Sequence, residues 1–276
     1  MDNKKLYCAV ALAGAMVSTS AQAFLGLQKS DFAKENFYFK AGATQIAPDV
    51  DSGPLEFYGL NDTAQAALDE GPYPGTGTDV STETMPSLTV GWILPWGNRH
   101  WSVETILAPP FEFEFYATGV ARYQSLAPEA YGIPTDVPAL GKTLGKTKML
   151  PPTVTLVYSF MPESKWRPYL GLGATYVYSF DEEITNPVLT EIREPDVELS
   201  ETFAWVAQAG IDVDITKNFF FGLDVKYVGD AKVEAEVTDI ELATSMDLLF
   251  PVAIDRNVVE QELNPTIYQI TLGYRF

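Results

Sequence analysis

Cysteine, histidine and positive charge are all scarce in this chain of 276 residues. The single cysteine excludes a disulfide framework and a cysteine-based zinc site, and the single histidine argues against a metal centre built from imidazoles. Lys and Arg number 18 against 37 Asp and Glu, a formal net charge of −19, so the chain lacks the basic surface that nucleic-acid binding requires. The glycine pair in Gly171-Leu172-Gly173 begins no helix, as a phosphate-binding loop would, and we expect no cofactor.

Long hydrophobic runs are also absent, and the one apolar stretch near the start is short. Lys4 and Lys5 precede the stretch Leu6–Val17, and Ala21-Gln22-Ala23 fits a cleavage site of the small-x-small type. The stretch is shorter than the ~20 residues that a spanning helix needs. We therefore expect residues 1–23 to be a secretory signal peptide of a Gram-negative envelope protein or a secreted protein.

What recurs in residues 24–276 is a period-two alternation over segments of about ten residues, which is typical of a transmembrane β-barrel. In the last segment, apolar and aromatic side chains alternate with mostly polar or small ones up to Phe276. Seven further segments show the same alternation: 37–44, 87–94, 101–115, 150–160, 169–180, 203–214 and 219–227. Eight strands permit antiparallel closure, and an open sheet edge in lipid would leave backbone groups unpaired. We predict an all-β fold, an eight-stranded antiparallel transmembrane β-barrel with long extracellular loops.

The predicted connections alternate between short and long. Short turns lie near 96–100, 162–167 and 215–218, and long connections span 48–84, 118–149, 181–201 and 229–263. This asymmetry fits short periplasmic turns and long extracellular loops in the cell outer membrane, with lipids and lipopolysaccharide as surroundings. Three of the long connections carry the acidic surplus. The surplus keeps loops soluble by self-repulsion, or alternatively binds divalent cations that bridge to lipopolysaccharide.

The interior of an eight-stranded barrel admits only side chains or one small ligand. The alternation places nine charged residues there: Lys40, Glu104, Glu112, Glu114, Asp212, Asp214, Asp224, Lys226 and Arg275. Charges confined in this way must pair, yet acids outnumber bases. The set is interpreted either as a structural plug of salt bridges or as a gated polar path.

Two further features bear on a passage through the wall. The last long connection contains an apolar patch of Leu248, Leu249, Phe250, Val252 and Ile254, which either continues the flanking strands above the membrane or lines an entrance for an apolar solute. Prolines cannot donate ladder hydrogen bonds, so Pro151 and Pro152 indicate a lateral gate in the wall, unless Pro152 simply begins its strand.

Several motifs resemble those of the outer-membrane protein W (OmpW) family. Leu150–Leu156, followed by Tyr158 and Phe160, resembles the family signature LPPTLTLQYxF, and Arg167–Gly173 resembles its RPYxGxG segment. Ala207–Asp212, Asp224–Tyr227 and the ending Gly273–Phe276 resemble later family segments. The long acidic loops and the segment Pro110–Glu114 depart from the family pattern.

This resemblance implies a monomeric barrel with a narrow hydrophobic channel for passive uptake of small hydrophobic molecules and sideways release into the membrane. It also implies that the barrel-assembly machinery reads the C-terminal strand ending at Phe276. A structural or adhesive barrel with a plugged lumen is the alternative. We expect no enzyme, because lipid hydrolysis needs a nucleophile with a base, and His100, the only histidine, falls at a short periplasmic turn beside Trp96 and Trp101.

Overall fold

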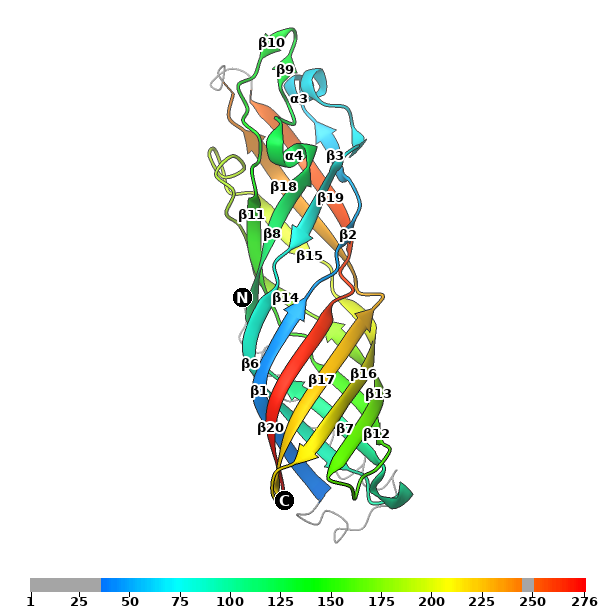
Figure 1. The fold of residues 1–276 in the computed structure, drawn as a ribbon. Helices are drawn as coiled ribbons and strands as arrows, with labels where there is room; N and C mark the ends of the chain where they lie inside the picture. The colour runs from blue at the N-terminus through cyan, green and yellow to red at the C-terminus, as the bar shows by residue number, and fades with distance from the viewer. Residues whose placement is uncertain (1–35, 245–250) are drawn as a thin grey trace.

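The computed structural model describes residues 36–244 and 251–276, which fold almost entirely into β-strands (Figure 1). The expected signal peptide, residues 1–23, lies outside the described residues, as do Leu248, Leu249 and Phe250. Within the described ranges, no helix has the length and apolar content needed to cross a bilayer.

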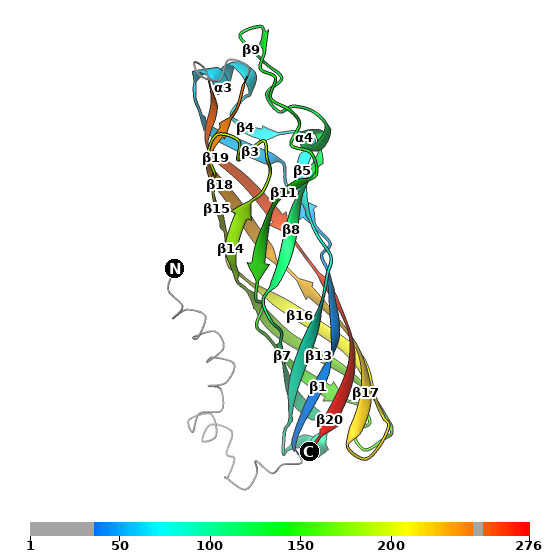
Figure 2. The same cartoon turned by 90° about the vertical axis from the view of Figure 1, so that its left-hand side faces the viewer.

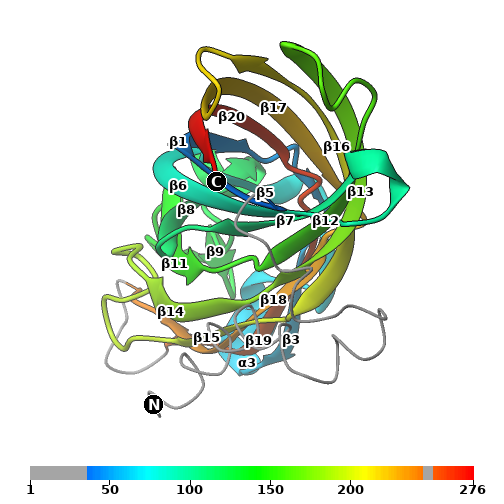
Figure 3. The same cartoon turned by 90° about the horizontal axis from the view of Figure 1, so that it is seen from below.

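Eight strands close into an antiparallel barrel in the order β1-β20-β17-β16-β13-β12-β7-β6. Their bounds are β1 Phe37–Ala47, β6 Glu83–Ile93, β7 Trp101–Leu107, β12 Thr153–Ser159, β13 Trp166–Val177, β16 Thr202–Asp214, β17 Phe219–Gly229 and β20 Thr266–Arg275. The ring closes where β1 pairs with β20 on one side and β6 on the other, and Figure 3 shows it from below. The predicted eight-stranded antiparallel barrel is therefore confirmed.

The side chains of the barrel strands alternate between the two faces of the wall as predicted. Along β17, Phe221, Leu223 and Val225 are exposed on the outer face, while Asp224 and Lys226 are buried inside. The same parity holds along β1, β12, β13, β16 and β20. Every outward position is thus free to contact lipid, and every inward position must fit a narrow interior.

Two sheets extend the barrel at the end where the long connections lie, and we call them the distal region (Figure 2). The four-stranded sheet has the order β14-β11-β8-β5, with β5 Thr76–Val80, β8 Phe111–Gly119, β11 Thr143–Met149 and β14 Ser179–Ile184. The six-stranded sheet has the order β15-β18-β19-β3-β4, and β2 also pairs with β19. The bounds of its strands are β2 Asp51–Ser52, β3 Leu55–Leu60, β4 Gly71–Tyr73, β15 Asp196–Leu199, β18 Lys232–Leu242 and β19 Val252–Glu262. The long connections are therefore largely folded.

Short elements cover the far end of the distal region. They are α3 Asp62–Ala67, α4 Val120–Tyr123 and the hairpin of β9 Glu129–Ala130 with β10 Ile133–Pro134. The opposite end of the molecule carries the short turns, including the 3-10 turn η2 Gly97–Arg99, together with the C-terminus (Figure 2).

Two apolar clusters fill the interior above the polar part of the barrel. The distal cluster includes Ala64 of α3, Ala121 of α4 and Leu126 from the connection between α4 and β9. Val252 and Ile254 also belong to it, with 0% and 3% exposure, and they lie on β19. These two residues therefore belong to a strand that continues above the barrel, and their side chains lie in its apolar core. A second cluster, which includes the residues Val206, Val228 and Ile267, lies where the distal region joins the barrel.

The predicted continuation of the third barrel strand through residue 115 is wrong. β7 ends at Leu107, and β8 belongs to the four-stranded sheet, where Phe113 is buried and the side chains of Glu112 and Glu114 face solvent. Pro109 and Pro110 interrupt the strand, because neither can donate a ladder hydrogen bond, and the chain resumes with the opposite parity. The Tyr116 hydroxyl donates to Glu114 (2.7 Å), which raises the pKa of Tyr116 to about 12. Glu112 and Glu114 are therefore not lumen charges.

Candidate functional site

The lower half of the barrel interior holds a continuous network of charged and polar side chains. Lys40 Nζ on β1 lies 2.8 Å from Glu104 Oε1 on β7 and 3.3 Å from Asp212 Oδ1 on β16. Tyr38 donates a 2.6 Å hydrogen bond to Glu104. The Lys40 ammonium also contacts Tyr169 on β13, which is the strand opposite β1 in the ring. These contacts span the full width of the lumen.

Gln208 joins this group to a second one around Lys226. Its amide nitrogen donates to Glu104 (2.8 Å) and to Asp224 (2.7 Å). Lys226 pairs with Asp224 and donates to Gln269 (2.7 Å). All of these side chains are almost completely buried, so the charges are stable only because they pair with one another.

Glycines make room for the large rings of the network. A Cβ added at Gly91 would collide with the ring of Tyr38, and one added at Gly210 would collide with Tyr169. The inward glycines on β6 and β16 thus admit two tyrosines into a lumen that is otherwise too narrow for them.

The short-turn end of the lumen is closed by an arginine that the sequence analysis missed. Arg167 is buried, and its NH1 atom lies 2.5 Å from Asp214 Oδ2, while Arg275 lies 3.9 Å from the same carboxylate. Both guanidinium groups lie against the ring of Phe220, at 5.3 and 5.1 Å. Arg167 lies two residues before Tyr169 on the same inward face of the strand, so the alternation already contained this signal.

The charge balance of the lumen differs from the predicted surplus of acids. Glu112 and Glu114 lie outside it, and Arg167 is added. Among the described residues, four acids therefore face four bases: Glu104, Asp212, Asp214 and Asp224 against Lys40, Arg167, Lys226 and Arg275. Seven of the nine predicted charges, together with Arg167, form this salt-bridged layer across the barrel axis.

Above this layer the interior is apolar. A small cavity of about 50 Å³, which we call the mouth cavity, lies inside the junction between the barrel and the distal region. Its lining includes the side chains of Phe113 and Met149 from the four-stranded sheet, and those of Val177, Val228 and Ile267 from the barrel strands. An apolar molecule that reached this level would thus meet the polar layer as a floor.

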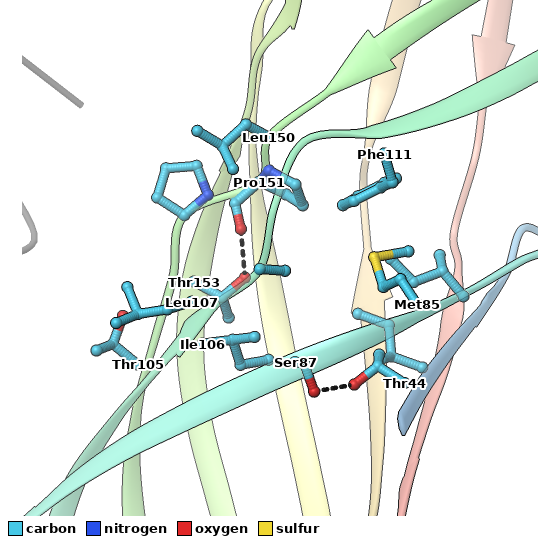
Figure 4. A pocket seen from close by; sticks show the side chains of 14 residues that line it. Thr44, Met85, Ser87, Thr105, Ile106, Leu107, Phe111, Leu150, Pro151 and Thr153 are labelled. Atoms are coloured by element: carbon cyan, nitrogen blue, oxygen red, sulfur yellow. Dashed lines mark hydrogen bonds between the residues drawn. The ribbon is translucent and has the colours of Figure 1, made fainter. Parts of the chain in front are cut away.

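A larger cavity of about 280 Å³, which we call the side cavity, lies next to the mouth cavity and crosses the barrel wall (Figure 4). Its inner part is lined by Thr44, Met85 and Ile267, whereas Leu107 and Pro152 belong to the outer face of the wall. An engineered apolar cavity of ~150 Å³ can hold benzene, so the side cavity is large enough for a small apolar molecule.

The side cavity exists because the wall is interrupted on two adjacent strands. The ladder between β7 and β12 ends at Thr153↔Ile106, and the ladder between β8 and β11 begins at Met149↔Phe111. The chain between these rungs includes two proline pairs, Pro109-Pro110 and Pro151-Pro152. Only the second pair was predicted from the sequence to interrupt the wall, although the first pair faces it across the same gap.

Rings of aromatic side chains on the outer wall indicate where the membrane lies. One ring, at the short-turn end, includes Trp101, Tyr158, Phe219, Tyr274 and Phe276. The other is a partial ring near the distal region on β13, β16 and β17, where Tyr176 packs on Phe203 at 4.6 Å and Trp205 on Tyr227 at 5.5 Å. The side cavity lies at the level of this second ring, because Thr153 pairs with Thr175, the neighbour of Tyr176. Aromatic rings of this kind mark the two membrane–water interfaces.

His100 lies at the short-turn end, as the sequence predicted. Its ring stacks on Tyr158 at 5.2 Å, and its Nδ1 atom lies 2.6 Å from the Ser159 carbonyl oxygen. In the described part of the chain, no three His, Cys, Asp or Glu side chains come together as a metal site.

A closed eight-stranded barrel with a lipid-facing apolar wall between two aromatic rings is a transmembrane barrel of the Gram-negative outer membrane. The distal region therefore lies outside the cell, and the short turns lie in the periplasm. The chain belongs to the OmpW family, whose profile matches residues 33–276.

Relatives agree with this assignment over nearly the whole chain. Outer membrane protein W of Vibrio cholerae is 25% identical over 274 residues, which is 99% of this chain and 100% of the relative. Outer membrane protein W of Salmonella typhi is 24% identical over 255 residues, which cover 91% and 93% of the two chains. The crystal structure of the outer membrane protein OprG from Pseudomonas aeruginosa superimposes with a TM-score of 0.66 at 22% identity, covering 88% of this chain and 96% of that one. This last similarity supports the fold.

Proposed function

We propose that this protein takes up small hydrophobic molecules passively across the lipopolysaccharide layer and releases them sideways into the outer membrane. The observation that carries the proposal is the side cavity, which crosses the wall at the level of the outer aromatic ring. The polar layer supports the same direction of travel. A molecule that continued straight down would have to break the buried pairs of Lys40 and Lys226, whereas the path sideways meets apolar side chains.

A path of this kind would let an apolar solute bypass the lipopolysaccharide headgroups. The packed and cation-bridged headgroups of lipopolysaccharide form a polar barrier that an apolar solute crosses slowly. The apolar interior of the distal region extends above this barrier. The mouth and side cavities connect this interior to the hydrocarbon region of the membrane. Five lining residues are common to these two cavities: Ile46, Phe111, Pro151, Thr153 and Ile267. Within this proposal Pro151 and Pro152 form the lateral gate.

The proposal includes how the protein reaches its membrane. Residues 1–23 would be removed as a signal peptide, and the barrel-assembly machinery would read the last strand. Phe276 supports the second step: its backbone NH bonds to the Phe37 carbonyl oxygen, and its ring packs on Phe39 at 5.4 Å, so this residue extends the pairing of β20 with β1 where the barrel closes.

Uptake by intact cells tests the proposed function. Cells that contain the protein should accumulate N-phenyl-1-naphthylamine, a neutral apolar dye that fluoresces in lipid, several times faster than cells of the same strain without it. A hydrophilic dye of similar size should enter both at the same rate, because the polar layer closes the axis. Equal uptake of the apolar dye with and without the protein would refute the proposal and favour the structural or adhesive alternative.

A further inference from the structure

Above the barrel, the continuations of β13 and β16 stay next to each other but pair with different sheets. Inside the barrel the two strands are paired from Trp166↔Val213 to Val177↔Thr202. Beyond the last rung, β14 pairs with β11 and β15 pairs with β18, so the two continuations join different sheets. In the described residues, no backbone hydrogen bond connects β14 to β15. We call this gap in the ladder the distal seam.

A cavity of about 70 Å³, which we call the seam cavity, lies directly behind the distal seam. The two unpaired edges contribute Ile184 from β14 and Val197 and Leu199 from β15, and each of these side chains is partly exposed. Leu144 and Val237 continue the apolar lining further inside. Solvent on the outside and an apolar interior thus meet at this seam.

The seam cavity is the next layer above the mouth cavity. On β5, β8 and β11, successive inward side chains line first one cavity and then the other. The pairs are Thr78 and Val80 on β5, Phe115 and Phe113 on β8, and Thr147 and Met149 on β11. A molecule held behind the seam is therefore one side-chain layer from the mouth cavity, and from there it reaches the side cavity.

The other boundaries of the distal region are closed. On the opposite side, hydrogen bonds join the two sheets: the Ser52 hydroxyl accepts from the Thr78 backbone NH (3.0 Å), and the Gln261 side-chain amide donates to the Thr78 hydroxyl (2.6 Å). Among the described residues at the far end, Ala64 and Ala121 are completely buried in the distal cluster. Opening either boundary would break hydrogen bonds or expose this core, whereas β14 and β15 can separate without loss of ladder bonds.

The loop between β14 and β15 fixes the outer end of the seam. The Asn186 side-chain amide donates to the carbonyl oxygens of Leu140 (2.7 Å) and Thr143 (2.6 Å), on the side of the four-stranded sheet. Arg193 pairs with Asp239 of β18 at 2.8 Å, on the side of the six-stranded sheet. The loop thus binds the four-stranded sheet near one of its ends and the six-stranded sheet near the other. The distal seam can therefore widen only between the parts of β14 and β15 below the loop.

We propose that β14 and β15 separate to admit small neutral apolar molecules, so that the distal seam is their binding site and the entrance through which they reach the interior. This inference rests on the proposed uptake function and adds the place where the apolar molecule enters the protein. The two edges carry five acidic residues: Asp181, Glu182, Glu183, Asp196 and Glu198. Lys148 pairs with Asp181, and Lys146, which also lines the seam cavity, pairs with Glu183, so a surplus of negative charge remains. Like charges repel at these distances, so the entrance selects neutral molecules over anionic ones of the same shape.

A reversible cross-link across the seam tests this inference. The double variant Ile184→Cys/Val197→Cys places one thiol on each edge, and the natural chain offers only Cys8, in the expected signal peptide. Intact cells are treated with a short bifunctional methanethiosulfonate after the protein has folded, and uptake of N-phenyl-1-naphthylamine is measured before and after reduction. The matched control is Glu234→Cys/Glu260→Cys, whose residues are directly opposite each other on the outer face of the paired strands β18 and β19.

Dye uptake by cells with the cross-linked seam variant should fall to that of cells without the protein and should recover on reduction. Uptake by cells with the cross-linked control pair should stay unchanged. The single variant Val197→Trp should also lower uptake several-fold, because the indole fills the seam cavity without chemical treatment. The anionic dye 8-anilinonaphthalene-1-sulfonate should enter more slowly than its neutral analogue.

Two results would overturn the inference in distinguishable ways. If the cross-linked seam variant and Val197→Trp both took up the neutral dye at the normal rate, the seam would not be the entrance, and the uptake function would stand. If the unaltered protein itself gave no uptake above cells without it, the proposed function and the entrance would fail together.

Discussion

The variant Ala108→Trp is expected to reduce uptake of an apolar dye by intact cells roughly tenfold, to near the rate of cells without the protein, because an indole fills most of a small-molecule pocket. Ala108 lines the side cavity beside Leu107 and Pro152, and it is only partly buried, so the larger side chain can turn into the open space. Overpacking at such a site destabilises a protein by ~1–3 kcal/mol, which leaves the barrel folded. Initial rates of fluorescence increase measure the effect.

The matched control is Leu88→Trp. Leu88 lies on the outer face of β6 directly opposite Leu107, and its side chain is exposed to the membrane without lining the side cavity. The same indole on the lipid-facing wall should leave uptake unchanged. The variant Pro151→Val/Pro152→Thr should also lower uptake, because residues with backbone NH groups can extend the ladder across the gap. Normal uptake in both Ala108→Trp and the double proline variant would contradict the lateral gate.

The variant Lys40→Met is expected to destabilise the barrel by ~3–5 kcal/mol, because removing one partner leaves buried carboxylates without a counter-charge. Lys40 is 3% exposed and pairs with both Glu104 and Asp212. Methionine keeps the length of the aliphatic chain, so the loss reports the charge. Urea unfolding of the protein in lipid vesicles, followed by tryptophan fluorescence, measures the change in unfolding free energy.

Lys148→Met provides the comparison for this measurement. Lys148 pairs with Asp181 at 3.2 Å on the surface of the distal region, and both side chains are about half exposed. Surface pairs of this kind contribute ~0–1 kcal/mol, so the control should unfold at nearly the same urea concentration as the unaltered protein. Equal stabilities of Lys40→Met and Lys148→Met would mean that water reaches the lumen layer and that the axis is not closed.

Strand alternation predicted the barrel well because every strand has lipid on one face and a narrow lumen on the other. The period of two is then imposed on the whole strand, as in β17, where Phe221 and Asp224 take opposite faces. A second rule, that proline removes a ladder donor, explains why β12 begins only at Thr153, after Pro151 and Pro152. Both features depend on local chemistry, which a sequence displays directly.

The distal region could not be predicted in the same way. Its strands have no lipid contact, several are short, and their partners are distant in the chain, as where β3 pairs with β19. The error at Glu112 and Glu114 has a related cause, because the break at Pro109-Pro110 changed both the partner strand and the parity. The distal seam depends on which sheet each strand joins, and this information is absent from local alternation.

Photochemical labelling from outside the cell tests most directly the central claim that the interior is an apolar chamber with a sideways exit and a closed polar floor. A neutral apolar diazirine is added to intact cells, which are then irradiated. The labelled residues are identified on the purified protein by peptide mass spectrometry. The account predicts adducts on Ile106, Phe111, Pro152 and Ile267, which line the side cavity, and none on Glu104, Gln208 or Lys226 in the polar layer. Adducts on the polar layer, with the side cavity unlabelled, would contradict it.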